Sequence, residues 1–93
     1  MAFNKTVVPV KLAQYGDESL VSRSQAKRLL ARVDRFQTVI MDFKDVETIG
    51  QSFADEIFRV FQRQHPEITL FAVNTSEEVA GMITRAKSAP AQP

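Results

Sequence analysis

Three short apolar runs, each followed by a stretch with helical spacing, constrain the fold of this chain more than any other feature. The runs are KTVVPVKLA, QTVIMDF and EITLFAV, at residues 5–13, 37–43 and 67–73. Each is short enough to be a strand and is rich in β-branched or aromatic residues. Consecutive strands joined through a helix normally lie parallel, with a right-handed crossover. The order therefore predicts a small α/β layer, with helices packed against a largely parallel sheet.

Helices are predicted over residues 22–36, 53–64 and 74–87, where apolar residues recur at i, i+3, i+4 and i+7. The expected buried faces are Ala26, Leu29, Leu30 and Val33; Ala54, Ile57, Phe58 and Phe61; and Val79, Met82, Ile83 and Ala86. A hydroxyl residue stands three positions before an amide or an acid at each predicted start, which is the spacing of a capping box. The three pairs are Ser22 with Gln25, Ser52 with Asp55, and Thr75 with Glu78.

The composition, 44% hydrophobic and 25% charged, is that of an ordinary globular domain. We expect one domain over residues 1–87 and a disordered tail over residues 88–93, where SAPAQP has little to bury. The chain has no cysteine, which excludes disulfides, thiolate metal sites and cysteine nucleophiles. No apolar run approaches the ~20 residues that cross a bilayer, and the N-terminus lacks the apolar run of a signal peptide. We therefore expect a cytoplasmic protein without a membrane partner.

Basic residues gather in the first predicted helix, although the net charge of the chain is only +1. The segment 22–36 carries Arg23, Lys27, Arg28, Arg32 and Arg35 against one acid. Arg28, Arg32 and Arg35 are spaced to share a helix face opposite the apolar stripe. Such a face could steer an acidic protein partner by charge, or track the phosphates of a nucleic acid. No aromatic residue interleaves for base stacking, and a charged outer face is usual for an amphipathic helix.

Acidic residues gather in the segment 42–56, which holds five acids against one lysine. Asp42 and Asp45, near a strand end, are the candidate pair for Mg²⁺. Polar residues commonly first appear at strand ends, however, and acids in a helix's first turn complement its dipole. We therefore expect no metal. The same segment could imitate nucleic-acid phosphates in a free-standing inhibitor of another complex.

Catalytic machinery is not indicated. The single histidine, His65, stands beside Pro66 at a predicted helix end, where a solvent-facing capping role is favoured over a catalytic one. The glycines are too far apart to form a phosphate-binding loop. We expect no enzymatic activity and no cofactor.

Gly50, Gln51 and Ser52 stand where the second strand feeds the second helix. They offer backbone amides and a hydroxyl at the positive end of a helix, where a phosphate is well tolerated electrostatically. A serine here is also a good structural cap, and on chemistry alone capping is the favoured interpretation.

Residues 20–68 closely resemble the bacterial STAS-like domains of unknown function. The shared features are a serine-arginine-serine start to an arginine- and leucine-rich helix, an aspartate-phenylalanine strand end, and a glycine-glutamine corner leading into FADEIFRVF. The close match covers about half of the chain. The resemblance implies a small STAS-like α/β domain, with a largely parallel or mixed sheet of about four strands packed by three helices.

The wider STAS group includes anti-sigma factor antagonists, in which an aspartate and a serine or threonine open the helix at this corner. The resemblance implies that a histidine-kinase-like ATPase phosphorylates that hydroxyl and thereby controls binding to an anti-sigma factor. In this sequence Gly50 stands at the aspartate position and Gln51 at the phosphoacceptor position. Ser52, one position later, is the only hydroxyl retained, so it is the candidate phosphoacceptor.

The leading hypothesis is a non-enzymatic regulatory domain that binds a protein partner through residues 49–59. The expected contacts are Gly50, Gln51, Ser52, Asp55, Glu56 and Arg59, with Arg23, Lys27, Arg28, Arg32 and Arg35 adding electrostatic docking. The implied partner is a histidine-kinase-like ATPase or an anti-sigma-like protein. The alternatives are a nucleic-acid accessory using residues 22–36 and an inhibitor using residues 42–56. A homodimer is also compatible with the sequence, since edge strands pair readily.

Overall fold

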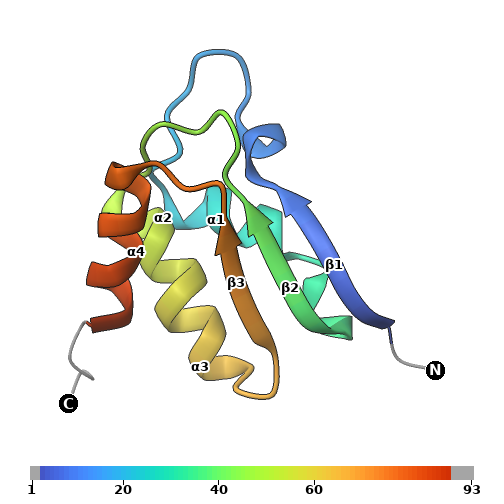
Figure 1. Cartoon of the computed structure of the whole chain (residues 1–93). Coiled ribbons are helices and arrows are strands. Elements are labelled where there is room, and N and C mark those ends of the chain that lie inside the picture. Colours follow the sequence, from blue (N-terminus) through green and yellow to red (C-terminus); the bar gives the residue numbers. More distant parts are fainter. Residues whose placement is uncertain (1–2, 89–93) are drawn as a thin grey trace.

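The computed structural model describes residues 3–88 and places three parallel strands side by side in the order β1–β2–β3 (Figure 1). β1 is Phe3–Pro9, β2 is Phe36–Asp42 and β3 is Thr69–Val73. The predicted α/β class is confirmed, and both strand pairs are parallel. The expectation of about four strands is wrong for the described residues, whose sheet has three.

The first apolar run is a strand only as far as Pro9, where the pairing with β2 ends opposite Asp42. Proline has no backbone N–H to donate to a neighbouring strand, so it is tolerated at a strand end. The chain then forms the 3-10 helix η1, Val10–Ala13, which places Val10 in the core.

Three helical segments cover one face of the sheet. They are α1, Arg23–Leu30; the continuous helix made of α2, Gln51–Asp55, the π-helical η3, Glu56–Phe61, and α3, Gln62–Gln64; and α4, Glu77–Ser88. Strands that follow the chain order, each joined by a right-handed crossover, put their connecting helices on the same side. The continuous helix α2–η3–α3 lies between α1 and α4 in this layer.

The first helix is shorter than predicted. The sequence predicts a helix through Phe36, whereas α1 ends at Leu30 and the chain makes a separate 3-10 turn, η2, over Val33–Arg35. The chain must return to the sheet here, because β2 begins at Phe36. Val33 is buried on this return path, so the apolar pattern of a longer helix comes from two separate segments.

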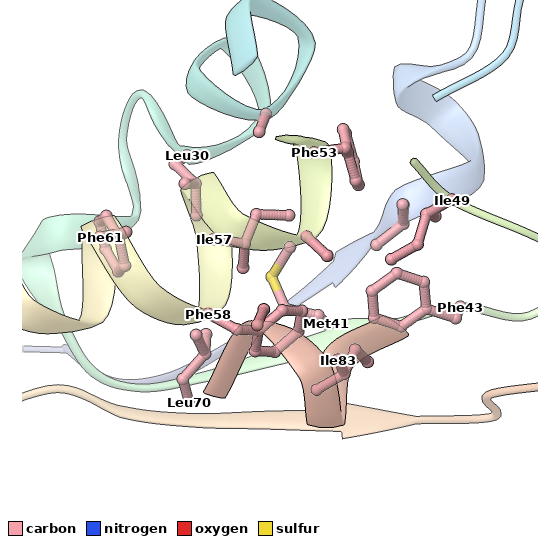
Figure 2. Close-up of a cluster of buried hydrophobic side chains, with 14 of the residues drawn as sticks. Leu30, Met41, Phe43, Ile49, Phe53, Ile57, Phe58, Phe61, Leu70 and Ile83 are labelled. Atoms are coloured by element: carbon pink, nitrogen blue, oxygen red, sulfur yellow. The ribbon is translucent and has the colours of Figure 1, made fainter. Parts of the chain in front are cut away.

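The core lies between the sheet and the helical layer (Figure 2). Met41 and Phe43, at the end of the central run, are fully buried against Phe53 and Ile57 of the middle helix. The predicted buried faces are confirmed, except that Leu29 and Met82 are only partly buried. The predicted tail of residues 88–93 lies outside the described residues apart from Ser88, which ends α4. No helix within residues 3–88 has the length and apolar character needed to cross a membrane.

Candidate functional site, the corner between the first two helices

The corner, residues 49–59, includes the junction at which Gly50 meets the segment that leads into α1. The amide of Gly50 donates to the carbonyl of Leu20 at 2.8 Å. A Cβ at Gly50 would lie 2.8 Å from the Cα and the Cβ of Val21, closer than atoms in proteins pack. The backbone φ of Gly50 is −81°, which any residue can adopt. Glycine is therefore required here by the close approach of two chain segments rather than by a special backbone conformation.

The start of α2 differs from the sequence prediction. Ser52 with Asp55 was expected to form the cap, but the helix begins at Gln51 with Gly50 at the N-cap position and no side-chain cap. That prediction is wrong because Ser52 already lies within the helix and Asp55 turns toward two arginines. Gln51 and Ser52 are both exposed, and no described residue forms a hydrogen bond with the Ser52 hydroxyl.

Asp55 and Glu56 form a buried charged cluster with Arg23 of α1 and Arg59 of η3. Arg23 Nη1 lies 2.8 Å from Asp55 Oδ2 and 3.4 Å from Glu56 Oε1. Arg59 donates to Asp55 from Nε and from Nη2, the latter at 2.6 Å to Oδ2. The two acids are 8% and 6% exposed, so their charges are neutralised by the arginines rather than by water. The arginines are more exposed, with 46% of the Arg23 side chain and 20% of the Arg59 side chain accessible, but removing either would leave a buried carboxylate less well compensated.

The electrostatics of the cluster favour the charged forms of Asp55 and of both arginines. The hydrogen bonds from Arg59 lower the pKa of Asp55 to about 2, against the opposing effect of burial and with further help from Arg23. The hydrogen bonds to Asp55 raise the pKa of Arg23 and of Arg59 above the ordinary value. Two carboxylates and two guanidiniums cancel in charge. The ion pairs therefore connect the start of α1 to the first turns of the middle helix beside the corner.

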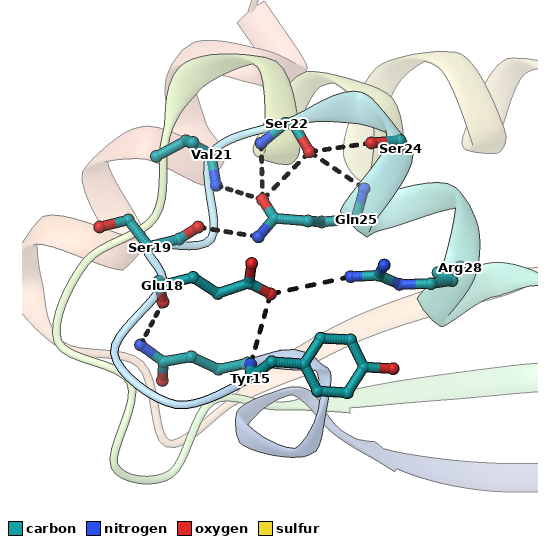
Figure 3. Close-up of polar contacts among 9 residues, drawn as sticks. Tyr15, Glu18, Ser19, Val21, Ser22, Ser24, Gln25 and Arg28 are labelled. Carbon is teal, nitrogen blue, oxygen red and sulfur yellow. Dashed lines mark hydrogen bonds and ion pairs between the residues drawn. The ribbon is translucent and has the colours of Figure 1, made fainter.

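The segment before α1 is held by a capping box, as predicted. The Ser22 side chain accepts from the Gln25 amide, and the Gln25 side chain accepts from the Ser22 amide at 2.8 Å (Figure 3). Gln25 also accepts from the Val21 amide and donates to the Ser19 carbonyl. This buried amide therefore fixes the strip of chain against which Gly50 packs. The sequence indicated its capping role but not these two further bonds.

The predicted basic face does not form as a continuous stripe. Arg28, Arg32 and Arg35 were expected on one helix face, but Arg32 and Arg35 lie beyond the end of α1. That prediction is wrong because the helix stops at Leu30, so the spacing no longer corresponds to one face. Arg28 pairs with Glu18 at 3.8 Å and lies 4.9 Å over the Tyr15 ring (Figure 3).

The other candidate residues are placed as follows. Lys27 is exposed on α1. Asp42 Oδ1 accepts from Asn74 Nδ2 at 2.9 Å and from the Lys44 amide at 3.0 Å, and the Asn74 bond is the main reason that the pKa of Asp42 is lowered. Within residues 3–88, no three histidine, aspartate or glutamate side chains gather in a way that could hold a metal.

His65 lies just beyond α3. Its amide donates to the carbonyl of Phe61 at 2.9 Å, and its ring packs on the Phe61 ring with the centroids 4.7 Å apart. Its Nδ1 lies 3.5 Å from a carboxylate oxygen of Glu67. These are the contacts of a helix-terminating residue, and they are remote from the corner.

Comparison with known proteins identifies the family of this chain. Residues 25–80, more than half of the chain, match the family model described as a STAS-like domain of unknown function. The match spans most of α1, the corner, the middle helix, β2, β3 and the start of α4. No curated protein and no solved structure matched the chain.

Proposed function

Because the chain belongs to the family of STAS-like domains of unknown function, we propose that it is a non-enzymatic protein-interaction domain that binds a partner through the corner of residues 49–59. One observation carries the proposal. Gln51 and Ser52 are exposed at the start of a helix whose next turn is connected to α1 by the ion pair of Asp55 with Arg23, while Arg59 also pairs with Asp55. Interfaces gain affinity when the contact residues are held in place before binding.

Fewer residues are exposed for direct contact with a partner than the sequence alone predicted. Asp55 and Glu56 are buried and paired, so they support the corner instead of meeting a partner directly. The direct contacts are Gln51, Ser52 and the outer part of Arg23, whose side chain is 46% exposed. Lys27 lies on the same short helix as Arg23 and adds positive charge, which favours association with an acidic partner.

The partner is a histidine-kinase-like ATPase or an anti-sigma-like protein, and the setting is the bacterial cytoplasm. Both parts of this proposal rest on the resemblance to anti-sigma factor antagonists. In the same scheme Ser52 accepts a phosphoryl group, and its exposed hydroxyl at a helix start suits that role. Phosphorylation would place added negative charge at the surface through which the partner binds.

The two alternative functions have less support. A nucleic-acid accessory needs a continuous basic face, and the basic residues of 22–36 are divided between α1 and the turn that follows it. An inhibitor that imitates phosphates needs free acids, and two of the five acids in residues 42–56, Asp55 and Glu56, are paired with arginines.

The proposal is tested by capture of partners from the lysate of the protein's own host. Wild type is compared with Gln51→Arg at the start of the middle helix, and with Gln64→Arg at its end as the matched control. Both positions are exposed, so both variants should fold. A partner retained by wild type and Gln64→Arg but lost from Gln51→Arg supports the corner. Equal retention by all three proteins would remove the corner from the proposal.

Phosphorylation is tested separately with the captured partner and ATP. The expected result is the addition of one phosphoryl group to wild type, located at Ser52 by peptide mapping. Ser52→Ala should abolish the addition, whereas Ser24→Ala, another exposed serine, should not. Phosphorylation of Ser52→Ala to the wild-type extent would exclude Ser52 as the acceptor.

A further inference from the structure

The sheet has a second face that no described helix covers. Side chains alternate between the two faces of a strand, and Val39, Met41 and Leu70 point into the core. Their neighbours point outward. Val7 is 54% exposed and Phe71 is 51% exposed, which is unusual for large apolar side chains on a parallel sheet. Parallel sheets are normally covered on both faces.

The outward residues form three rows across the sheet, as fixed by the strand register. The middle row is apolar, with Val7 opposite Ile40 and Ile40 opposite Phe71. The row toward the strand starts is Lys5, Thr38 and Thr69; the row toward the strand ends is Pro9, Asp42 and Val73. An apolar centre is thus flanked by a cation at one end and an anion at the other.

We propose that this face binds the same face of a second copy, so that the protein forms a symmetric dimer through its open sheet. The two-fold axis would lie between the two sheets, perpendicular to the strands and level with the middle row. It would place the two sheets face to face, with the strands of one copy antiparallel to those of the other. Val7, Ile40 and Phe71 would then each meet the same residue of the second copy. Lys5 would lie beside Asp42 of the partner subunit, and symmetry would form this ion pair twice.

The charges select this alignment over its main competitor. If the two-fold axis ran along the strands, the strands would be parallel and β2 would lie over β2 in the same direction. Asp42 would then face Asp42 of the partner subunit, which like-charge repulsion disfavours. Reversing the strands removes this clash and brings each Asp42 near a lysine. The face therefore complements itself in one orientation.

The size of the face sets the strength of the dimer. Three strands and five residues along each span about 14 Å by 17 Å. Even counted on both copies, a footprint of this size is well below the roughly 1,000 Å² of total buried surface that is usual for stable, specific association. We therefore expect a weak dimer, in equilibrium with monomer at micromolar to millimolar concentration. This inference does not depend on the corner, which lies at the helical layer.

Sedimentation equilibrium from about 10 μM to about 1 mM tests the dimer directly. Wild type should show reversible monomer–dimer association. Phe71→Lys should raise the dissociation constant by at least about tenfold, because it buries a charge in the apolar row. Leu12→Lys is the matched control: Leu12 is more exposed than Phe71 but lies in η1, outside the face, so association should be unchanged. A wild type that stays monomeric throughout, or a dimer unaffected by Phe71→Lys, would overturn the proposal.

Charge reversal tests the orientation. Lys5→Asp should weaken self-association, because the introduced carboxylate would face Asp42 of the partner subunit, whereas Lys11→Asp, outside the face, should not. Asp42→Lys should weaken it in the same way. An equimolar mixture of Lys5→Asp and Asp42→Lys should associate more strongly than either variant alone, because both cross-pairs become complementary. Unchanged association of Lys5→Asp overturns the alignment even if Asp42→Lys, which also loses the bond to Asn74, does not fold.

Discussion

Arg23, the first residue of α1, forms an ion pair with Asp55, the last residue of α2, with 2.8 Å between Nη1 and Oδ2. This contact ties the start of one helix to the first turns of its neighbour. It explains why the acids that dominate the corner in the sequence are not displayed at its surface. Arg23 was expected to contribute to a charged docking surface on the basic helix. In the structure it also supports the site through its ion pair with Asp55.

The cluster predicts a dependence of stability on acidity. The pKa of Asp55 is about 2 in the folded chain and 3.8 ordinarily, so the unfolded chain takes up the proton first as the pH falls. The stabilisation is therefore complete above about pH 5 and is largely lost as the pH falls to about 2. It amounts to at most about 2 kcal/mol.

Urea denaturation of wild type and Asp55→Asn at about pH 6 and about pH 2 checks this. Wild type should lose more free energy of unfolding between the two conditions than Asp55→Asn does. Asp17→Asn, on an exposed turn outside the cluster, is the control for the substitution itself. Equal losses in wild type and Asp55→Asn would show that Asp55 does not contribute in this way.

Gly50→Ala is expected to destabilise the domain by about 1–3 kcal/mol, since the new Cβ would overlap the Val21 backbone. Gly81→Ala is the matched control. Gly81 lies inside α4 with open space where a Cβ would stand, so alanine there should stabilise by about 0.5–1 kcal/mol. The measurement is the midpoint of urea unfolding for both variants. Similar effects at the two glycines would contradict the close approach at Gly50.

Ser22→Ala and Ser52→Ala should differ, although both serines looked like helix caps in the sequence. Ser22 accepts from the Gln25 amide at 3.1 Å, so its loss should cost about 1 kcal/mol. Ser52 forms no cap, so its alanine variant should stay within about 0.5 kcal/mol of wild type. Thermal and urea unfolding of both variants settle the point, and a larger loss for Ser52→Ala would reverse our assignment of the helix start.

Ser76, not Thr75, should carry the cap of α4. Ser76 Oγ accepts from the Val79 amide at 3.0 Å and donates to the Glu47 carbonyl at 2.6 Å. Ser76→Ala should therefore lower the free energy of unfolding by about 1–2 kcal/mol, measured by urea denaturation. Thr75→Ala, at the residue that the sequence pattern indicated, should cost less. The prediction fails if the order of the two losses is reversed.

Much of the fold was predictable because it depends on neighbours in the chain. The alternation of runs and helical spacing predicted the parallel α/β layer, and the apolar spacing of the middle helix identified its buried residues. The Ser22–Gln25 capping box was also predicted correctly, because each partner lies within one helical turn of the other. Helical periodicity and capping depend on residues that are close together in the chain. A single sequence therefore contains enough information to predict them.

The features of the fold and of the site that could not be predicted depend on contacts between segments that are distant in the chain. Helix α1 ends at Leu30 because the chain must reach β2, and no local signal marks that point. Gly50 is explained by Val21, and the buried Asp55 by Arg23, each pair being well separated in the chain. The same holds for the open sheet face, since the register that aligns its apolar middle row exists only once the strands pair. The sequence by itself determined the elements and their inward faces, and the tertiary structure decided which charges are neutralised and which surfaces remain for a partner.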